Sequence, residues 1–335
     1  MVSKQAVAVV GVGAWGTVLA LQLSRNGHRV RLWSHDLELA EDLRHERENK
    51  KFLPAYKLPD TIQIFTDAQA TVQNVQAVVF VTASQFVRST LEQFKPHLAE
   101  QVSLLNATKG LELNTNRSMG EVFFEVLGAD RCERLAFLSG PNLSSEIAQQ
   151  LPSTTVIASE NAEVARYFQN LFHSTLFRVY TNSDVLGVQL GGTLKNAIAL
   201  AAGILEGLGY GYNARAGLMV RGLAEITRLA VSMGAQQTTL YGLSGLGDLI
   251  CTCSPASRNY SVGMRIGQGE TLADIKRSML SVAEGVDTAK VARVLAKQHH
   301  VDMPIMQGVC AILFDGRSAR EISEQLMGRE LKAEI

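Results

Sequence analysis

A single lysine, Lys195, lies near the centre of a long apolar stretch, residues 185–211, which reads VLGVQLGGTLKNAIALAAGILEGLGYG. An ammonium group is costly to place among Leu, Ile and Ala side chains unless a specific interaction uses it. A specific use of the Lys195 ammonium is therefore the first functional hypothesis that this sequence raises. The alternative is a helix lysine whose side chain extends to solvent.

Other charged side chains occur in apolar or glycine-rich settings. Lys109, in NATKGLE, directly follows a predicted strand, at the edge of a parallel sheet where ligands bind, although surface lysines also occur in such loops. Asp248, in GLSGLGDLICTC, lies in a glycine-flanked turn, where it could also cap the following helix. Ser257, Arg258 and Asn259 form a cluster of hydrogen-bond donors suited to a phosphate group. The alternative is that Arg258 and Asn259 are an ordinary pair of polar loop residues without a ligand.

The first strong pattern is a dinucleotide fingerprint in residues 7–33, VAVVGVGAWGTVLALQLSRNGHRVRLW. Gly11 allows a tight turn, Gly13 lets the backbone approach a pyrophosphate, and Gly16 lets a helix pack closely on a strand. The helix N-terminus would face the phosphates. The alternative is a glycine-rich turn without a ligand. The position between a strand and a helix favours the nucleotide site.

The residue after the second strand bears on the choice between NAD and NADP. The fingerprint expects an acidic residue there for the ribose 2′-hydroxyl, and this chain has Ser34, followed by His35 and Asp36. A serine does not repel a 2′-phosphate, and His35, helped by Arg31, could attract it. Asp36 leaves NAD open. We therefore expect NADP, with NAD as the alternative.

Composition limits the class of protein. The chain has 335 residues, 46% hydrophobic and 19% charged, and its Lys+Arg and Asp+Glu totals of 32 each give no net charge. This length suits two domains, and the charge balance gives no indication of a nucleic-acid or acidic-membrane partner. Four cysteines in such a chain favour a reducing, cytoplasmic setting over a disulfide scaffold. Cys251 and Cys253 could be half of a metal site, but no second pair has zinc-like spacing, so we expect no metal.

Short β-branched runs alternate with helix-length spacers in the first half of the chain. This pattern predicts buried strands of a mostly parallel, doubly wound α/β sheet. The runs are Val7–Val10, His28–Trp33, Ala77–Thr82, Val102–Thr108, Arg134–Gly140, Ser153–Ser159 and Leu176–Tyr180.

The second half of the chain is predicted to be all-helical. Residues 213–234 place Met219 and Ile226 on an apolar face and Arg221 and Glu225 on the opposite, polar face, with Asn213 as the N-cap and Gly234 after the C-terminus. Helical patterns continue in 289–296 and 319–327. We therefore expect a Rossmann-like dinucleotide-binding domain, residues 1–184, and an all-helical substrate and catalytic domain, residues 185–335. A buried core helix explains residues 185–211 better than a membrane span, because of Lys195 and Asn196.

With these segments in view, the chain resembles NAD(P)-dependent glycerol-3-phosphate dehydrogenases of the bacterial type over nearly its whole length. The resemblance rests on an ordered set of motifs, which is far more specific than any one of them. They are GVGAWG, WSHD, FLP, ATKGLE, SGPN, GVQLGGTLKN, GLGDLICTC, SRN and the pair Glu284–Gly285.

The resemblance implies interconversion of dihydroxyacetone phosphate and sn-glycerol 3-phosphate by hydride transfer with NAD(P)H, supplying glycerol phosphate for phospholipid synthesis. Lys195 matches the family's catalytic lysine, which donates or accepts the proton. The substrate contacts that it implies are Lys109, Gly140, Asn142, Lys195, Asp248, Ser257, Arg258 and Asn259. The cofactor contacts are Gly11, Gly13, Ala14, Trp15, Gly16, Ser34, His35, Lys109, Ser144, Arg258, Val282 and Glu284. Asn142, Ser144 and Ala14 depart from the family's usual residues at their positions.

Two other functions stay open on the sequence alone. One is another lysine-dependent, two-domain NAD(P) dehydrogenase, whose hydroxy-acid substrate would offer a carboxylate to Arg258. The other is a non-catalytic nucleotide-binding sensor, which has no need of a buried lysine. A small-molecule substrate is expected, without nucleic acid or stable membrane association. A homodimer is the expected assembly, because symmetric dimers are common among soluble enzymes.

Overall fold

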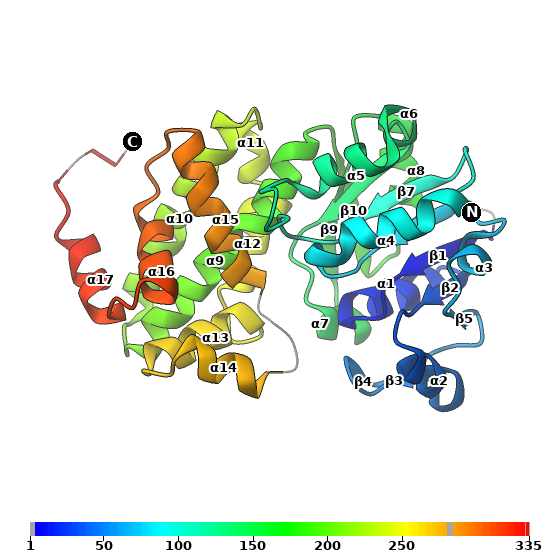
Figure 1. Cartoon of the computed structure of the whole chain (residues 1–335), viewed down its shortest axis with the longest axis horizontal. Helices are drawn as coiled ribbons and strands as arrows, with labels where there is room; N and C mark the ends of the chain where they lie inside the picture. The colour runs from blue at the N-terminus through cyan, green and yellow to red at the C-terminus, as the bar shows by residue number, and fades with distance from the viewer. Residues whose placement is uncertain (1–3, 280–283, 332, 335) are drawn as a thin grey trace. The chain divides into compact units, whose positions relative to one another are not determined.

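The computed structural model describes residues 4–279, 284–331 and 333–334. The chain divides into two compact units (Figure 1). The first comprises Met1–Glu112 and Arg117–Gln189, and the second comprises Leu113–Asn116 and Leu190–Ile335.

An eight-stranded sheet forms the centre of the first unit, in the order β10-β9-β8-β7-β6-β1-β2-β5. Neighbouring strands are parallel except for β8 and β9, which are antiparallel. The seven predicted strands are all present, so the predicted Rossmann-like fold is confirmed; β5 was not predicted. The strands are β1 (Ala6–Val10), β2 (Arg29–Trp33), β5 (Ile62–Phe65), β6 (Ala77–Phe80), β7 (Ser103–Asn106), β8 (Leu135–Ser139), β9 (Ser153–Ala158) and β10 (Phe177–Asn182).

Helices cover both faces of this sheet, which explains the uninterrupted apolar character of its strands. In β1, Val7 and Val9 belong to one hydrophobic cluster, whereas Ala8 and Val10 belong to another. The helical segments are α1 (Ala14–Arg25), α2 (Leu37–Glu46), α3 (Ala68–Val72), η1 (Ser84–Phe86), α4 (Val87–Phe94), η2 (Lys95–His97), α5 (Met119–Leu127), α6 (Ala129–Cys132), α7 (Ser144–Ala148) and α8 (Ala162–Phe172). A small hairpin, β3 (Glu48–Asn49) and β4 (Leu53–Lys57), stands apart from the sheet.

In its described residues the second unit contains helices and turns but no strand. Its main part begins within α9 (Val185–Gly207), at Leu190. Its other helices are α10 (Tyr212–Ser232), α11 (Gln237–Leu240), η3 (Leu243–Gly247), α12 (Asp248–Thr252), α13 (Arg258–Gly267), α14 (Leu272–Ser278), α15 (Glu284–Gln298), α16 (Pro304–Phe314) and α17 (Ala319–Met327).

Helix α9 is the core helix of this unit. It is long and apolar enough to cross a membrane, but 89% of its most apolar window is buried inside the fold. Helix α13 packs against it with close backbone contact. A Cβ at Gly203 would lie 2.0 Å from the carbonyl oxygen of Tyr260, and a Cβ at Gly263 would lie 2.0 Å from that of Leu200. The burial of residues 185–207 thus has a packing explanation.

The structure corrects two predictions for α10. Gly211 is its N-cap, not Asn213. Glu225 was predicted on the polar face but is only 2% exposed, and its carboxylate accepts the backbone N–H groups of Ile305 and Met306 at 2.7 and 3.1 Å. These groups open α16 and have no partner within that helix, so a buried acceptor is stabilising there. Gly234 follows the helix with φ +105°, as predicted.

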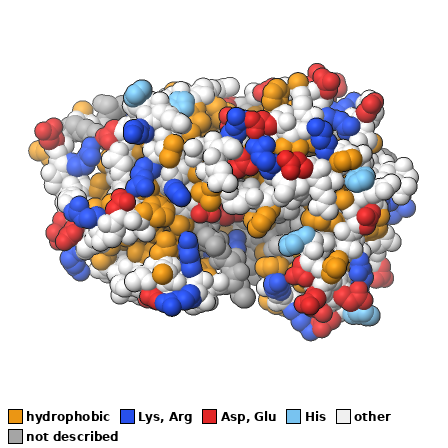
Figure 2. Space-filling view, in the orientation of Figure 1, with side chains coloured by type: hydrophobic (Ala, Val, Ile, Leu, Met, Phe, Trp, Pro, Cys, Tyr) orange, Lys and Arg blue, Asp and Glu red, His pale blue; other side chains and the backbone are white. Residues whose placement is uncertain are grey.

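The surface charge is mixed. On the face drawn in Figure 2, Lys and Arg side chains are interspersed with Asp and Glu side chains. This distribution agrees with the absence of net charge in the sequence.

Candidate functional site

The glycine-rich loop after β1 has the geometry that its spacing predicts. Gly11 has φ +127°, and a Cβ there would lie 2.8 Å from the carbonyl oxygen of Val81. A Cβ at Gly16, in α1, would lie 2.0 Å from the carbonyl oxygen of Gly11, whereas one at Gly13 would meet nothing within 4 Å. The first and third glycines therefore permit tight packing, and the second leaves the backbone open to a ligand.

Unsatisfied polar atoms mark the same edge of the sheet. Five buried side-chain atoms lack a hydrogen-bond partner within residues 4–279, 284–331 and 333–334. Three of them follow or end strands whose carboxyl ends share one edge: Trp15 Nε1 after β1, Thr82 Oγ1 after β6, and Ser139 Oγ in β8. A buried donor or acceptor without a partner is destabilising. A dinucleotide binds outside the carboxyl ends of such strands, and it could supply hydrogen-bond partners to these three atoms.

The end of β2 holds the residues expected to distinguish the two cofactors. Ser34 is buried, and its hydroxyl donates to the carbonyl of Asp36 at 2.9 Å. Asp36 caps α2 by accepting the N–H of Leu39 at 3.0 Å, which holds the pKa of its carboxyl below the usual value, with help from Lys51. His35 is exposed. Both Ser34 and Asp36 thus have local partners, and His35 faces solvent.

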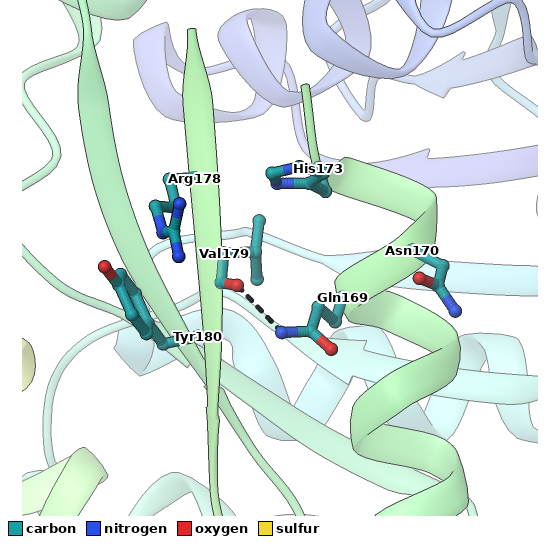
Figure 3. Close-up of a pocket in the computed structure, with 6 residues that line it drawn as sticks. All are labelled: Gln169, Asn170, His173, Arg178, Val179 and Tyr180. Carbon is teal, nitrogen blue, oxygen red and sulfur yellow. Dashed lines mark hydrogen bonds between the residues drawn. The ribbon is translucent and has the colours of Figure 1, made fainter. Parts of the chain in front are cut away.

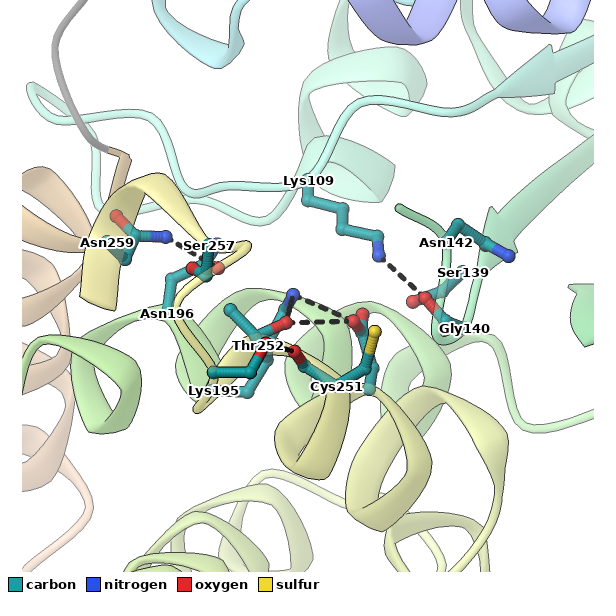
Figure 4. Close-up of polar contacts among 12 residues, drawn as sticks. Lys109, Ser139, Gly140, Asn142, Lys195, Asn196, Cys251, Thr252, Ser257 and Asn259 are labelled. Carbon is teal, nitrogen blue, oxygen red and sulfur yellow. Dashed lines mark hydrogen bonds and ion pairs between the residues drawn. The ribbon is translucent and has the colours of Figure 1, made fainter. Parts of the chain in front are cut away.

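Lys109 follows β7, and its ammonium donates to the carbonyl oxygen of Gly140 at 3.1 Å (Figure 4). Gly140 follows β8 and has φ +140°. Asn142, two residues on, is fixed by β9: its amide donates to Thr154 O at 3.1 Å and accepts from the Thr155 hydroxyl at 2.9 Å. The structure therefore brings together Lys109, Gly140 and Asn142. Ser144 is the first residue of α7.

Lys195 is buried in α9 and does not extend to solvent. The residue is 6% exposed, and its ammonium contacts Asp248 Oδ1 at 2.7 Å and the hydroxyl of Thr252 (Figure 4). Thr252 Oγ1 also lies 3.2 Å from Asp248 Oδ1. Gly247, not Asp248, is the N-cap of α12, so the simple capping role is wrong. Asp248 and Thr252 thus fix the position of the Lys195 nitrogen, and an amine held in this way can take part in proton transfer.

Sequence reasoning missed Thr252. It lies four residues after Asp248, which puts the two side chains on one face of α12. This spacing was the available signal, but a threonine in a helix has many ordinary roles. Only the packing of α12 beside α9 makes Thr252 a partner of Lys195.

The predicted phosphate cluster lies at the start of α13. Ser257 is the N-cap, and Arg258 is exposed as the first helical residue. The amide of Asn259 donates to Asn196 Oδ1 at 2.9 Å and accepts the N–H of Gly285 at 3.0 Å. A helix N-terminus with an arginine suits an anion. The sequence did not predict Asn196 as a partner of this cluster.

Glu284 and Gly285 begin α15. Val282, also predicted to contact the cofactor, lies outside the described residues.

A separate cavity of about 270 Å³ opens beside α8 and β10 (Figure 3). Its lining residues are Gln169, Asn170, His173, Arg178, Val179 and Tyr180. Gln169 donates to the carbonyl of Val179 at 2.8 Å, and Arg178 lies over the ring of Tyr180. None of the predicted site residues lines this cavity. Within the described part of the chain, no group of three His, Cys, Asp or Glu side chains is placed to hold a metal ion.

Comparison with known proteins places these observations in a family. The family model for the N-terminus of NAD-dependent glycerol-3-phosphate dehydrogenase matches residues 6–165, and the model for its C-terminus matches residues 184–324. A glycerol-3-phosphate dehydrogenase [NAD(P)+] of Syntrophotalea carbinolica is 46% identical over 98% of this chain and 99% of its own length. The corresponding protein of Chlorobium limicola is 44% identical over 98% and 99%.

A solved structure agrees with these relatives. The crystal structure of glycerol-3-phosphate dehydrogenase from Coxiella burnetii covers 97% of this chain and 99% of its own, with a TM-score of 0.93 and 35% identity. Both halves of the chain, with their motifs in order, are therefore accounted for by one family. The chain belongs to the NAD-dependent glycerol-3-phosphate dehydrogenase family.

Proposed function

We propose that this chain interconverts dihydroxyacetone phosphate and sn-glycerol 3-phosphate with a nicotinamide cofactor. The observation that carries the proposal is the buried contact of Lys195 with Asp248 and Thr252. A structural helix needs no ammonium there, and removing such a group from water is costly. The names of the relatives, which specify the substrate and NAD(P)+, support the same conclusion.

Proton transfer at the substrate C2 oxygen is the role we assign to Lys195. When bound, the nicotinamide cofactor supplies or accepts the hydride at C2. Reduction of the carbonyl builds negative charge on its oxygen, and the Lys195 ammonium would donate a proton to it. In the reverse direction the neutral amine would take the hydroxyl proton. Asp248 and Thr252 would orient the amine, because both contact it in the structure.

The substrate phosphate is assigned to Ser257, Arg258 and Asn259. Ser257 and Arg258 open α13, whose N-terminal dipole adds to the charge of the guanidinium. Asn259 would act from a fixed position, because Asn196 and Gly285 hold its amide. Lys109, Gly140 and Asn142 are assigned to the substrate from the first unit.

The dinucleotide is assigned to the glycine-rich loop and the neighbouring strand ends. The proposed contacts are Gly11, Gly13, Ala14, Trp15, Gly16, Ser34, His35, Lys109, Ser144, Arg258, Val282 and Glu284. We propose NADP as the preferred form. The exposed imidazole of His35 is available to a 2′-phosphate, and the Asp36 carboxylate is already bound by Leu39 and Lys51.

The substrate assignment is tested by following nicotinamide absorbance with dihydroxyacetone phosphate and with unphosphorylated dihydroxyacetone. We expect kcat/KM for the phosphorylated substrate to be at least about 100-fold higher, because charge-assisted phosphate contacts contribute several kcal/mol. Each substrate is run with NADPH and with NADH. Equal kcat/KM values for the two substrates would reject the phosphate assignment and favour another hydroxy-compound dehydrogenase. No oxidation with either substrate would favour a nucleotide-binding sensor.

We also propose that the protein is a homodimer in the cytoplasm, that it supplies glycerol phosphate for phospholipid synthesis, and that its domains are residues 1–184 and 185–335. Two apolar side chains of α10, Tyr212 at 81% exposed and Val220 at 57%, are available to such an interface. Light scattering in solution distinguishes a dimer from a monomer.

A further inference from the structure

Lys109 belongs to a segment, residues 107–112, that follows β7 and contains no helix or named strand, although Leu111 forms an isolated antiparallel bridge with Ser118. Backbone outside regular elements has many conformations open to it, and a lysine side chain adds further rotamers. A lysine that must reach one position on a substrate therefore needs its backbone held by other contacts. The structure shows where these contacts come from.

The segment after β6, residues 82–88, holds the segment after β7 residue by residue. The hydroxyl of Thr108 donates to the carbonyl of Thr82 at 2.7 Å. The amide of Gln85 donates to the carbonyl of Leu111 at 2.9 Å. Between these two bonds Gly110 has φ +142°, and a Cβ there would lie 2.6 Å from the Cβ of Ser84. Lys109 is thus flanked on both sides by fixed positions.

The strongest of these contacts is the pair formed by Arg88 and Glu112. The guanidinium donates to both carboxylate oxygens of Glu112, at 2.9 and 2.8 Å, and its Nη2 also donates to Glu125 at 2.7 Å. The Glu112 side chain is 11% exposed and that of Arg88 29%. A bidentate, largely buried guanidinium–carboxylate pair fixes the relative position of its two side chains far better than an exposed ion pair does. The backbone N–H of Glu112 also donates to the carbonyl oxygen of Arg117, which fixes the end of the segment.

We propose that the Arg88–Glu112 pair is a positioning device that sets the place of Lys109 in the substrate site. The proposal rests on the proposed function, in which Lys109 contacts the substrate. Neither Arg88 nor Glu112 is assigned to the substrate or the cofactor. Their effect is to hold the backbone at residues 110–112, so that the Lys109 ammonium stays near the carbonyl of Gly140.

A double-mutant cycle on Lys109 and Glu112 tests the proposal. The variants are Glu112→Gln, Lys109→Ala and the two together, assayed for KM and kcat with dihydroxyacetone phosphate. Cofactor affinity is measured separately by NADPH fluorescence, and folding by thermal unfolding. Glu270→Gln is the matched control, since it removes the carboxylate of another forked arginine pair, with Arg265 in the second unit. Arg88→Lys gives a second route if Glu112→Gln does not fold.

We expect Glu112→Gln to raise KM for dihydroxyacetone phosphate about tenfold while kcat changes less than about twofold, because a charge-assisted pair that positions a substrate contact is weakened. The Kd for NADPH should change no more than it does in Lys109→Ala, because Lys109 is also assigned to the cofactor. Arg88→Lys should raise KM in the same direction, and Glu270→Gln should leave both constants unchanged. In the Lys109→Ala background Glu112→Gln should have no further effect on KM, since the two residues then act as a unit.

Two results would separate the possible failures. If Lys109→Ala raises KM but the effect of Glu112→Gln simply multiplies with it, or is absent, the positioning role is wrong and the substrate role of Lys109 stands. If Lys109→Ala itself leaves KM unchanged, the assignment of Lys109 to the substrate is wrong, and the positioning role is rejected with it.

Discussion

Two buried charged residues of the second unit, Lys195 and Glu225, have different partners and therefore different consequences. Lys195 has a carboxylate and a hydroxyl beside it. Among the residues that the structure describes, the hydrogen-bond partners of the Glu225 carboxylate are the neutral backbone N–H groups of Ile305 and Met306. Burial raises the pKa of Glu225 from 4.5 to about 7, although these hydrogen bonds and Arg228 oppose the shift, while Asp302 adds to it.

Glu225 should make the stability of the protein depend on pH. Because its pKa is higher in the folded state, the stabilisation is complete below the unfolded pKa of 4.5 and is lost as pH rises through about 7. Between pH 4.5 and 8 the loss amounts to about 3 kcal/mol in the free energy of unfolding. Urea unfolding of the wild type and of Glu225→Gln at several pH values measures it as the difference between the two proteins.

The exposed Glu270 provides the control, because its pKa is lowered by Arg265 and it stays ionised over this range. Glu270→Gln should therefore follow the wild type from pH 5 to 8. Parallel pH profiles for Glu225→Gln and the wild type would show that Glu225 does not titrate in this range.

The sequence predicted catalytic candidates at this scale where a charge contrasts with its neighbours. Lys195 is such a residue, alone in an apolar stretch. Thr252 and Asn196 carry no such contrast, and their roles arise only when α12 and α13 pack beside α9. The prediction that Glu225 lies on the exposed polar face was wrong for a related reason. Its place on the helix matched the polar face, and the N-terminus of α16 that it caps is 80 residues away in the chain.

At the scale of elements, close packing of α9 and α13 depends on glycines that face a neighbouring backbone. Gly203 should therefore not tolerate a side chain. Gly203→Ala would place a Cβ 2.0 Å from the carbonyl oxygen of Tyr260 and should lower the free energy of unfolding by about 3 kcal/mol, because helix backbones cannot shift cheaply. Thermal and urea unfolding measure the change.

Gly217 in α10 is the matched control, since a Cβ there meets nothing within 4 Å. Gly217→Ala should leave stability unchanged or raise it by up to about 1 kcal/mol, because alanine favours a helix more than glycine does. An equal effect for the two substitutions would reject the packing explanation.

Elements with strong periodicity were predictable, and short or half-exposed ones were not. The strands at the centre of the sheet are continuous apolar runs, because helices bury both their faces. The strand β5 lies at the sheet edge, where its IQIF sequence alternates between buried and exposed side chains and is too short to stand out. The hairpin of β3 and β4 pairs only a few residues, and β4 contains Pro54.

At the scale of the whole molecule, each unit by itself carries residues that the proposed function uses. The first carries the dinucleotide fingerprint, Lys109 and the unsatisfied polar atoms at the strand ends. The second carries Lys195 with Asp248 and Thr252, and the phosphate cluster of α13. The family match spans both units, which a nucleotide-binding fold alone would not require. Composition could predict two domains but not which side chains each contributes.

The most direct test of the central claim is single-turnover oxidation of bound NADPH by dihydroxyacetone phosphate in the wild type and in Lys195→Met. Methionine keeps the apolar part of the side chain, and since Asp248 loses its buried partner, the variant is assayed where circular dichroism shows it folded. We predict that the rate falls by at least about 1,000-fold while the Kd for NADPH stays within about twofold, because the proton carrier is lost and the dinucleotide site is intact. A rate within tenfold of the wild type, with the cofactor bound normally, would contradict the account.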